Sequence, residues 1–163
     1  MSNNAPCLAD SPEPPPLSTP IPSNLSYSFG MPGGAYGLAT ARTTVHRLLH
    51  AHGLADMAEL GVLAASELLG NACLFTPDRQ ASLSVWWRFS VLRLTVFDEH
   101  PRHSKEVRDS CHAQRRAALH TLDTVLAACG GLGCGLDEVA GPLAGNKMWV
   151  AFSRDAARNY THL

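Results

Sequence analysis

The chain has 163 residues, 45% of them hydrophobic, and a formal net charge of −1, which together suit one compact domain with its own core. The near-zero charge supplies no basic field for nucleic acid, so we expect no direct DNA or RNA binding. The sequence has no uninterrupted stretch of eighteen or more apolar residues, and its N-terminal segment lacks the features of a signal peptide. We therefore expect a cytoplasmic protein without a membrane segment.

The N-terminal part of the chain is predicted to form a tail, a strand and two helices. Residues 1–24 hold most of the prolines, and such a segment buries too little apolar surface to offset its ordering entropy. Residues 25–29 alternate apolar and polar side chains, which predicts a short strand. Apolar residues recur every three or four positions over 36–52 and over 54–75, which predicts two helices separated by a cap at Gly53.

The middle of the chain is predicted to form a hairpin. Residues 81–90 and 91–100 both alternate and are rich in β-branched and aromatic side chains, which favours two antiparallel strands. The adjacent Trp86 and Trp87 face opposite ways in such a strand, so one of them is a candidate for exposure. The segment 103–117 is highly charged and has no apolar stripe, which indicates a solvated connection.

The C-terminal part is predicted to contain a helix over 118–129 and a closing strand or hairpin that includes 147–152, followed by a tail at 154–163. Strands that alternate and helices with one apolar stripe suit a two-layer α+β fold. We expect a single domain over residues 25–153, with helices on one face of a mixed, mostly antiparallel sheet.

Histidine and cysteine are frequent enough to raise the question of a metal site. The chain has eight histidines and five cysteines. His100 with His103, and Cys111 with His112, are the closest groupings. A structural zinc site needs four ligands at recognisable spacing, and no such set stands out in the sequence, so we expect no zinc site here. The cysteines are expected to be reduced and mostly buried.

Three polar residues interrupt otherwise apolar segments. Glu67 and Asn71 stand four residues apart in SELLGNA, so they project from the same face of the helix predicted over 54–75. Asp98 follows an apolar alternation, which places its carboxylate at the rim of the sheet. On spacing alone, these residues are also consistent with exposed polar side chains and an ordinary turn cap.

The motifs SELLGNA, VFDEHPR, HTLDTVLAAC and GNKMWVAF occur in this order along the chain. In this respect the chain resembles the GHKL superfamily of ATPase domains, in particular the small actinobacterial anti-sigma-factor and serine-kinase-like proteins, over residues 25–153. The resemblance implies a Bergerat-like fold that binds ATP and Mg²⁺. It implies Glu67 as the general base, Asn71 as the magnesium ligand and Asp98 as the acceptor for the exocyclic amine of adenine.

The sequence departs from the family's pattern at several positions. Leu119 and Thr121 stand where the family has a glycine-rich turn that lets backbone N–H groups approach the phosphates. Lys147 stands in the adenine site where the family has a threonine, and its ammonium is expected to pair with Asp98 there. The family's cation after Asn71 is also missing. Four basic residues remain as a candidate lid over a triphosphate: Lys105, Arg108, Arg115 and Arg116.

Two functions of different classes follow from these observations. The first is an ATP-binding regulator of the anti-sigma-factor type, which sequesters a sigma factor or a similar partner. If it is an active enzyme, it phosphorylates a serine or threonine of an antagonist protein. The second is a pseudo-ATPase interaction module that has lost nucleotide binding. Both imply a protein partner without direct contact to nucleic acid or membrane, and both are compatible with a homodimer.

Overall fold

The computed structural model describes residues 18–140 and 144–163. Most of the expected proline-rich tail, residues 1–17, lies outside the described residues. Two short 3₁₀ turns, Pro22–Asn24 and Ala55–Met57, accompany the main elements. These elements are β1 Ser26–Met31, α1 Gly37–Ala51, α2 Ala58–Phe75, β2 Ala81–Arg88, β3 Val91–Asp98, α3 Lys105–Ala118, α4 His120–Cys129, β4 Gly133–Val139, β5 Gly145–Ser153 and α5 Arg154–Tyr160.

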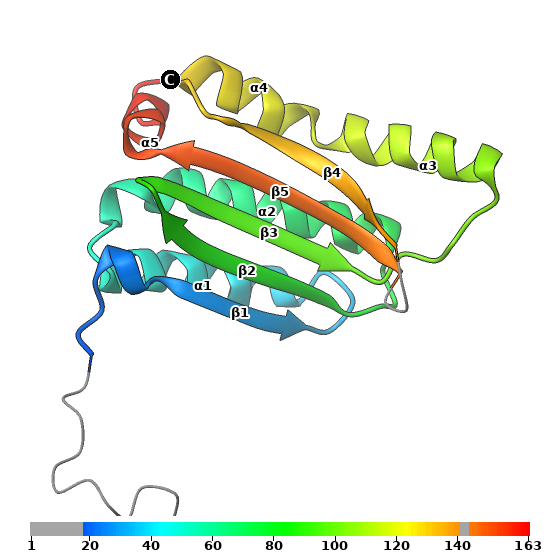
Figure 1. Ribbon diagram of the computed structural model, residues 1–163, viewed down its shortest axis with the longest axis horizontal. Helices are drawn as coiled ribbons and strands as arrows, with labels where there is room; N and C mark the ends of the chain where they lie inside the picture. The colour runs from blue at the N-terminus through cyan, green and yellow to red at the C-terminus, as the bar shows by residue number, and fades with distance from the viewer. Residues whose placement is uncertain (1–17, 141–143) are drawn as a thin grey trace, which may run out of the picture.

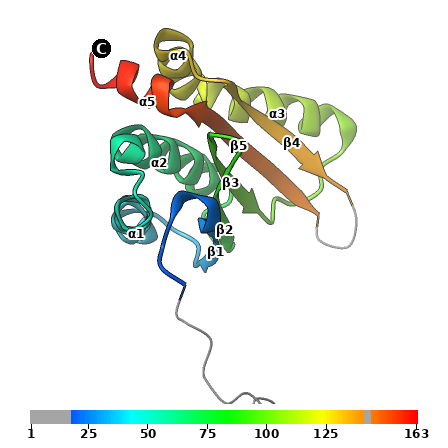
Figure 2. The same cartoon turned by 60° about the vertical axis from the view of Figure 1, so that its left-hand side comes forward.

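The described strands form one sheet in the order β1-β2-β3-β5-β4, and each neighbouring pair is antiparallel. Helices α1 and α2 cover one face of this sheet, while α3 and α4 follow one another alongside β4 (Figure 1). The turned view shows α1 and α2 together on the same side of the strands (Figure 2). The predicted two-layer α+β architecture is therefore confirmed, with a fully antiparallel sheet in place of a mixed one.

Strand β3 shows how the alternation builds the core. Leu92, Leu94 and Val96 are buried beneath the helices, and Asp98 continues the same inward-facing row at the end of the strand. Helix α2 packs over this row and buries half of its residues. The stretch Ala55–Phe75 is long and apolar enough to span a membrane by length and composition, but half of it is buried inside the domain, as in the core helix of a small soluble protein.

Two segments differ from what we expected. The charged stretch 103–117 is largely helical, because α3 begins at Lys105 and runs to Ala118. In this helix only Cys111, His112 and Arg115 are not exposed. The helix therefore has no apolar stripe, and hydrophobic periodicity does not predict it. The expected tail 154–163 contains α5, whose Ala156 and Ala157 are buried against the core.

Within residues 18–140 and 144–163, no helix covers the other face of the sheet, which we call the helix-free face. Trp86, Arg93 and Trp149 lie on it, with the Arg93 guanidinium 5.9 Å from the Trp86 ring and 4.7 Å from the Trp149 ring. Trp86 is half-buried, and the exposed aromatic residue of the hairpin is Phe89, at 93%. Phe89 and Ser90 both have positive φ, at 52° and 61°, the backbone that a two-residue type I′ turn requires.

Candidate functional site

The three predicted site residues come from two adjacent elements. Asn71 lies near the end of α2 and is 3% exposed, and Asp98 lies at the end of β3 and is fully buried. Glu67 is one turn earlier on α2, half-buried, and makes no hydrogen bond or ion pair within residues 18–140 and 144–163. The structure therefore brings Asn71 and Asp98 to one end of the sheet, with Glu67 one turn away on the same helix.

Arg115 from α3 joins Asn71 to Asp98. Its guanidinium forms a two-pronged ion pair with Asp98, in which Nη1 donates to Oδ1 at 3.0 Å and Nη2 donates to Oδ2. Its Nε donates to Asn71 Oδ1 at 3.0 Å, and Asn71 Nδ2 donates back to the Arg115 carbonyl at 2.8 Å. We call these three residues the Arg115 network.

The surroundings of the Arg115 network are apolar. The guanidinium carbon lies 5.4 Å from the centre of the Phe75 ring, and Nη2 is 3.5 Å from the sulfur of Met148. Arg115 is fully buried, so both charges of the ion pair have lost their contact with water. Two buried charges are tolerated only when they are paired with good geometry and further hydrogen bonds, and the two-pronged contact and the Asn71 bonds meet this condition.

This geometry does not fit ATP and Mg²⁺. Recognition of adenine requires an open carboxylate at Asp98, but both of its oxygens accept hydrogen bonds from Arg115. A magnesium ligand at Asn71 requires an open amide oxygen, but that oxygen accepts from Arg115 Nε. The structure thus brings together Asp98 and Asn71, the side chains that the resemblance implied for adenine and magnesium. Hydrogen bonds from Arg115 occupy the oxygen atoms of both.

The expected pairing of Lys147 with Asp98 is wrong. Lys147 stands opposite Phe97 in the β3–β5 ladder and opposite Asp137 in the β4–β5 ladder. It is exposed on the helix-free face, whereas Asp98 points to the helix-covered face. Successive side chains of a strand alternate between faces, so the row that contains Lys147 cannot meet the row that contains Asp98.

The positions of the missing glycine-rich turn lie elsewhere. Leu119 is buried at the junction of α3 and α4, where its N–H donates to the Arg116 carbonyl. Thr121 is exposed in the first turn of α4. A buried leucine side chain at this junction supports helix packing and does not form an open backbone cradle, so this segment does not resemble a phosphate-binding turn.

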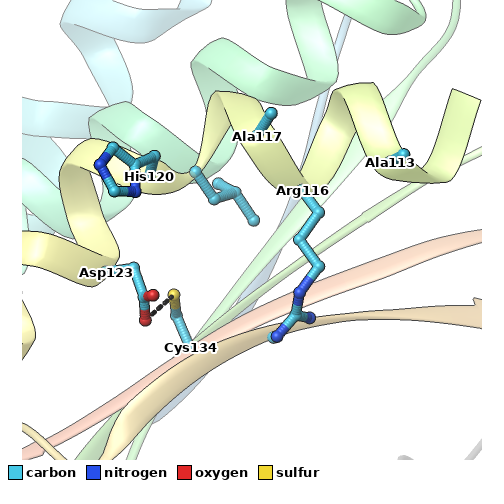
Figure 3. Close-up of a pocket in the computed structure, with 8 residues that line it drawn as sticks. Ala113, Arg116, Ala117, His120, Asp123 and Cys134 are labelled. Atoms are coloured by element: carbon cyan, nitrogen blue, oxygen red, sulfur yellow. Dashed lines mark hydrogen bonds between the residues drawn. The ribbon is translucent and has the colours of Figure 1, made fainter.

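A pocket of about 620 Å³ forms a groove between the α3–α4 junction and β4 (Figure 3). It is lined by Arg116, Leu119, His120, Asp123 and Cys134 among others, and by none of Glu67, Asn71, Asp98 and Lys147. The Cys134 thiol donates to Asp123 Oδ1 at 3.7 Å. Burial, and then the charge and hydrogen bond of Asp123, raise the pKa of Cys134 to about 11, so this thiol is a poor nucleophile at neutral pH.

The sequence pointed to Asn71 and Asp98 but not to their partner. From the sequence, Arg115 is only one of the four basic residues of a candidate lid. The alternation of β3 could have indicated such a partner. The pattern that buries Leu94 and Val96 also buries Asp98, and a buried carboxylate needs a cation beside it.

Comparisons with models of known protein families and with curated protein sequences found no match to this chain.

Proposed function

We propose that the chain is a cytoplasmic protein-interaction module on a GHKL-like scaffold, in which Arg115 takes the place of a nucleotide. The observation that carries this proposal is the Arg115 network, since it uses both carboxylate oxygens of Asp98 and the amide oxygen of Asn71. By the motif resemblance, the partner is a sigma factor or an anti-sigma antagonist. The module regulates transcription through that contact, without touching nucleic acid or membrane.

The helix-free face of the sheet supports the hypothesis of a protein-interaction module. Trp86, Arg93 and Trp149 form a stacked arginine and tryptophan group there. Tryptophan and arginine are the residue types that contribute most to binding energy in protein interfaces, and both are rigid or pre-organised in this arrangement. A protein contact needs no nucleotide to form on this surface.

A second candidate is an ATP-binding switch in which α3 moves away. The burial of α3 favours it, because only Cys111, His112 and Arg115 of this helix are not exposed. Withdrawal of Arg115 would expose Asp98 and Asn71 together, beside a Glu67 that has no partner among the described residues. In that open form, the chain would be the ATP- and Mg²⁺-dependent regulator or serine/threonine kinase that the motifs imply.

Calorimetric titration with ATP and Mg²⁺ separates the two candidates. We expect no heat of binding from the wild-type chain at millimolar ATP, because the adenine acceptor is occupied. Heat of binding in Arg115→Ala would show that the site can still bind ATP once the Arg115 guanidinium is removed. No heat in this variant would show that the site has lost ATP binding altogether. Either result for the variant is consistent with the module, whereas binding of ATP by the wild-type chain overturns it in favour of the switch.

Two further measurements complete the test. Lys147→Thr serves as the control variant, because its side chain lies on the other face and the substitution should not change the titration. Binding of purified sigma factors and their antagonists from the native cell should occur without nucleotide and should weaken in Trp149→Ala. A partner that binds only when ATP is present would contradict the proposal.

A further inference from the structure

Three metal-binding side chains converge beside the Arg115 network. His100 and His103 lie in the loop between β3 and α3, and Cys111 lies in the second turn of α3. The Nε2 atoms of the two histidines are 2.9 Å apart, and Cys111 Sγ is 3.1 Å from His100 Nε2. One ligand atom from each residue lies within 4.8 Å of the others. All three side chains are half-buried.

Hydrogen bonding alone accounts poorly for this cluster. A neutral imidazole nitrogen either donates or accepts, yet His100 Nε2 is approached by a second imidazole nitrogen and by a thiol. The other nitrogen of the same ring, Nδ1, is buried and has no partner among the described residues. The position of His100 is therefore better explained by the lone pair that it directs toward the other two ligands.

We infer that His100, His103 and Cys111 form a binding site for one zinc ion. Two imidazole nitrogens and a thiolate suit Zn²⁺ and do not suit hard cations such as Mg²⁺, which prefer oxygen ligands. With Zn–N of about 2.0–2.1 Å and Zn–S of about 2.3 Å, the ligand atoms of a tetrahedral site stand roughly 3.3–3.6 Å apart. The two contacts of His100, at 2.9 and 3.1 Å, reach these values with shifts of a few tenths of an ångström, and the remaining pair, His103 and Cys111, lies within 4.8 Å and would close around the ion.

A small cavity adjoins the three side chains. His100, His103 and Cys111 line this cavity of about 20 Å³, which has room for one water molecule or one ion. His100 and His103 also line a second cavity of about 340 Å³. Glu138 of β4 lines the smaller cavity, and among the described residues it makes only a long ion pair with Arg108, at 3.9 Å. Three protein ligands leave a fourth position, which either the Glu138 carboxylate or a water molecule completes.

The zinc ion would fasten α3 to the domain. Cys111 precedes Arg115 by four residues, so both project from the same face of α3. A bond from Cys111 through the ion to the β3–α3 loop holds that face against the end of the sheet, where Arg115 reaches Asp98. The cysteine proton leaves as zinc binds, because the thiolate is the ligand. The site is argued from its own geometry and does not depend on the proposed interaction function.

The test uses the full, untagged, reduced chain after removal of metal with a chelator. Addition of zinc should give one bound equivalent per chain and a rise in the melting temperature. Cobalt, used as a spectroscopic probe, should give a thiolate-to-metal charge-transfer band and the visible bands of a tetrahedral site. Substoichiometric zinc, or octahedral cobalt without the charge-transfer band, would overturn the site.

Variants assign the ligands. Cys111→Ser should abolish the charge-transfer band, and Cys111→Ser and His103→Gln should each weaken zinc binding by more than about tenfold. Cys134→Ser, a half-buried cysteine in the groove beside β4, is the matched control and should bind zinc as the wild-type chain does. Circular dichroism of the metal-free variants checks that they are folded. Full zinc affinity in folded Cys111→Ser would refute the assignment. A loss of affinity in Glu138→Gln assigns the fourth position to the carboxylate, and an unchanged affinity assigns it to water.

Discussion

The Arg115 network predicts a large loss of stability when the guanidinium alone is removed. Arg115→Met keeps an apolar stem of similar length but takes two charge-assisted hydrogen bonds from Asp98 and one hydrogen bond from Asn71. Asp98 is fully buried, and removal of one partner of a buried ion pair costs about 3–5 kcal/mol because the remaining charge is left uncompensated. We therefore expect the free energy of unfolding to fall by about 3–5 kcal/mol.

Urea unfolding followed by circular dichroism measures this loss, with the slope of the transition as a check that the unfolding remains comparable. Arg116→Ala, next in sequence but exposed, is the matched control and should change the free energy by less than about 0.5 kcal/mol. The double variant Asp98→Leu/Arg115→Met removes both charges and should recover most of the loss. A loss below about 1 kcal/mol in Arg115→Met, or a double variant no more stable than the single one, would refute the buried pairing.

Two further predictions concern the sheet and the groove beside β4. In Gly145→Ala the new Cβ would lie 2.1 Å from the Asp98 carbonyl oxygen and 2.7 Å from the Phe97 ring, so we expect a loss of about 3 kcal/mol in urea unfolding. A loss within 0.5 kcal/mol would mean that β3 and β5 separate easily at this end. In Asp123→Asn the negative charge beside Cys134 disappears, so the pKa of this thiol should fall from about 11. Alkylation of Cys134 should then become faster at a given alkaline pH, and an unchanged pH profile of the rate would contradict the assigned cause.

The elements with regular patterns were predictable from the sequence. The apolar stripe of α2 and the alternation of β2 and β3 have tertiary packing that agrees with their local periodicity, so the sequence predicts both their type and their position. The patterns place Asn71 on a helix and Asp98 at the end of a strand, but only the motif resemblance implied that the two side chains lie close together.

The remaining parts depend on contacts that leave no periodic signal. The residues of helix α3 that are not exposed are Cys111, His112 and Arg115. Residues of these types also occur in solvated segments, so they do not indicate a buried helix face. Helix α5 is too short and too charged to show a stripe, although it buries Ala156 and Ala157. The face of Lys147, by contrast, follows from the alternation of β5 itself, because Met148, Val150 and Phe152 are buried and Lys147 alternates with them.

The sparse attachment of α3 has a consequence for local opening. Most of its side chains face solvent, so in the metal-free chain the helix can unfold while the sheet and α2 remain intact, at a free energy set mainly by the contacts of Arg115. Backbone amides of α3 should therefore exchange with deuterium much earlier than those of α2. Protease cleavage under native conditions should likewise occur in α3 first, leaving an N-terminal fragment that contains β1, β2, β3 and both helices that cover them.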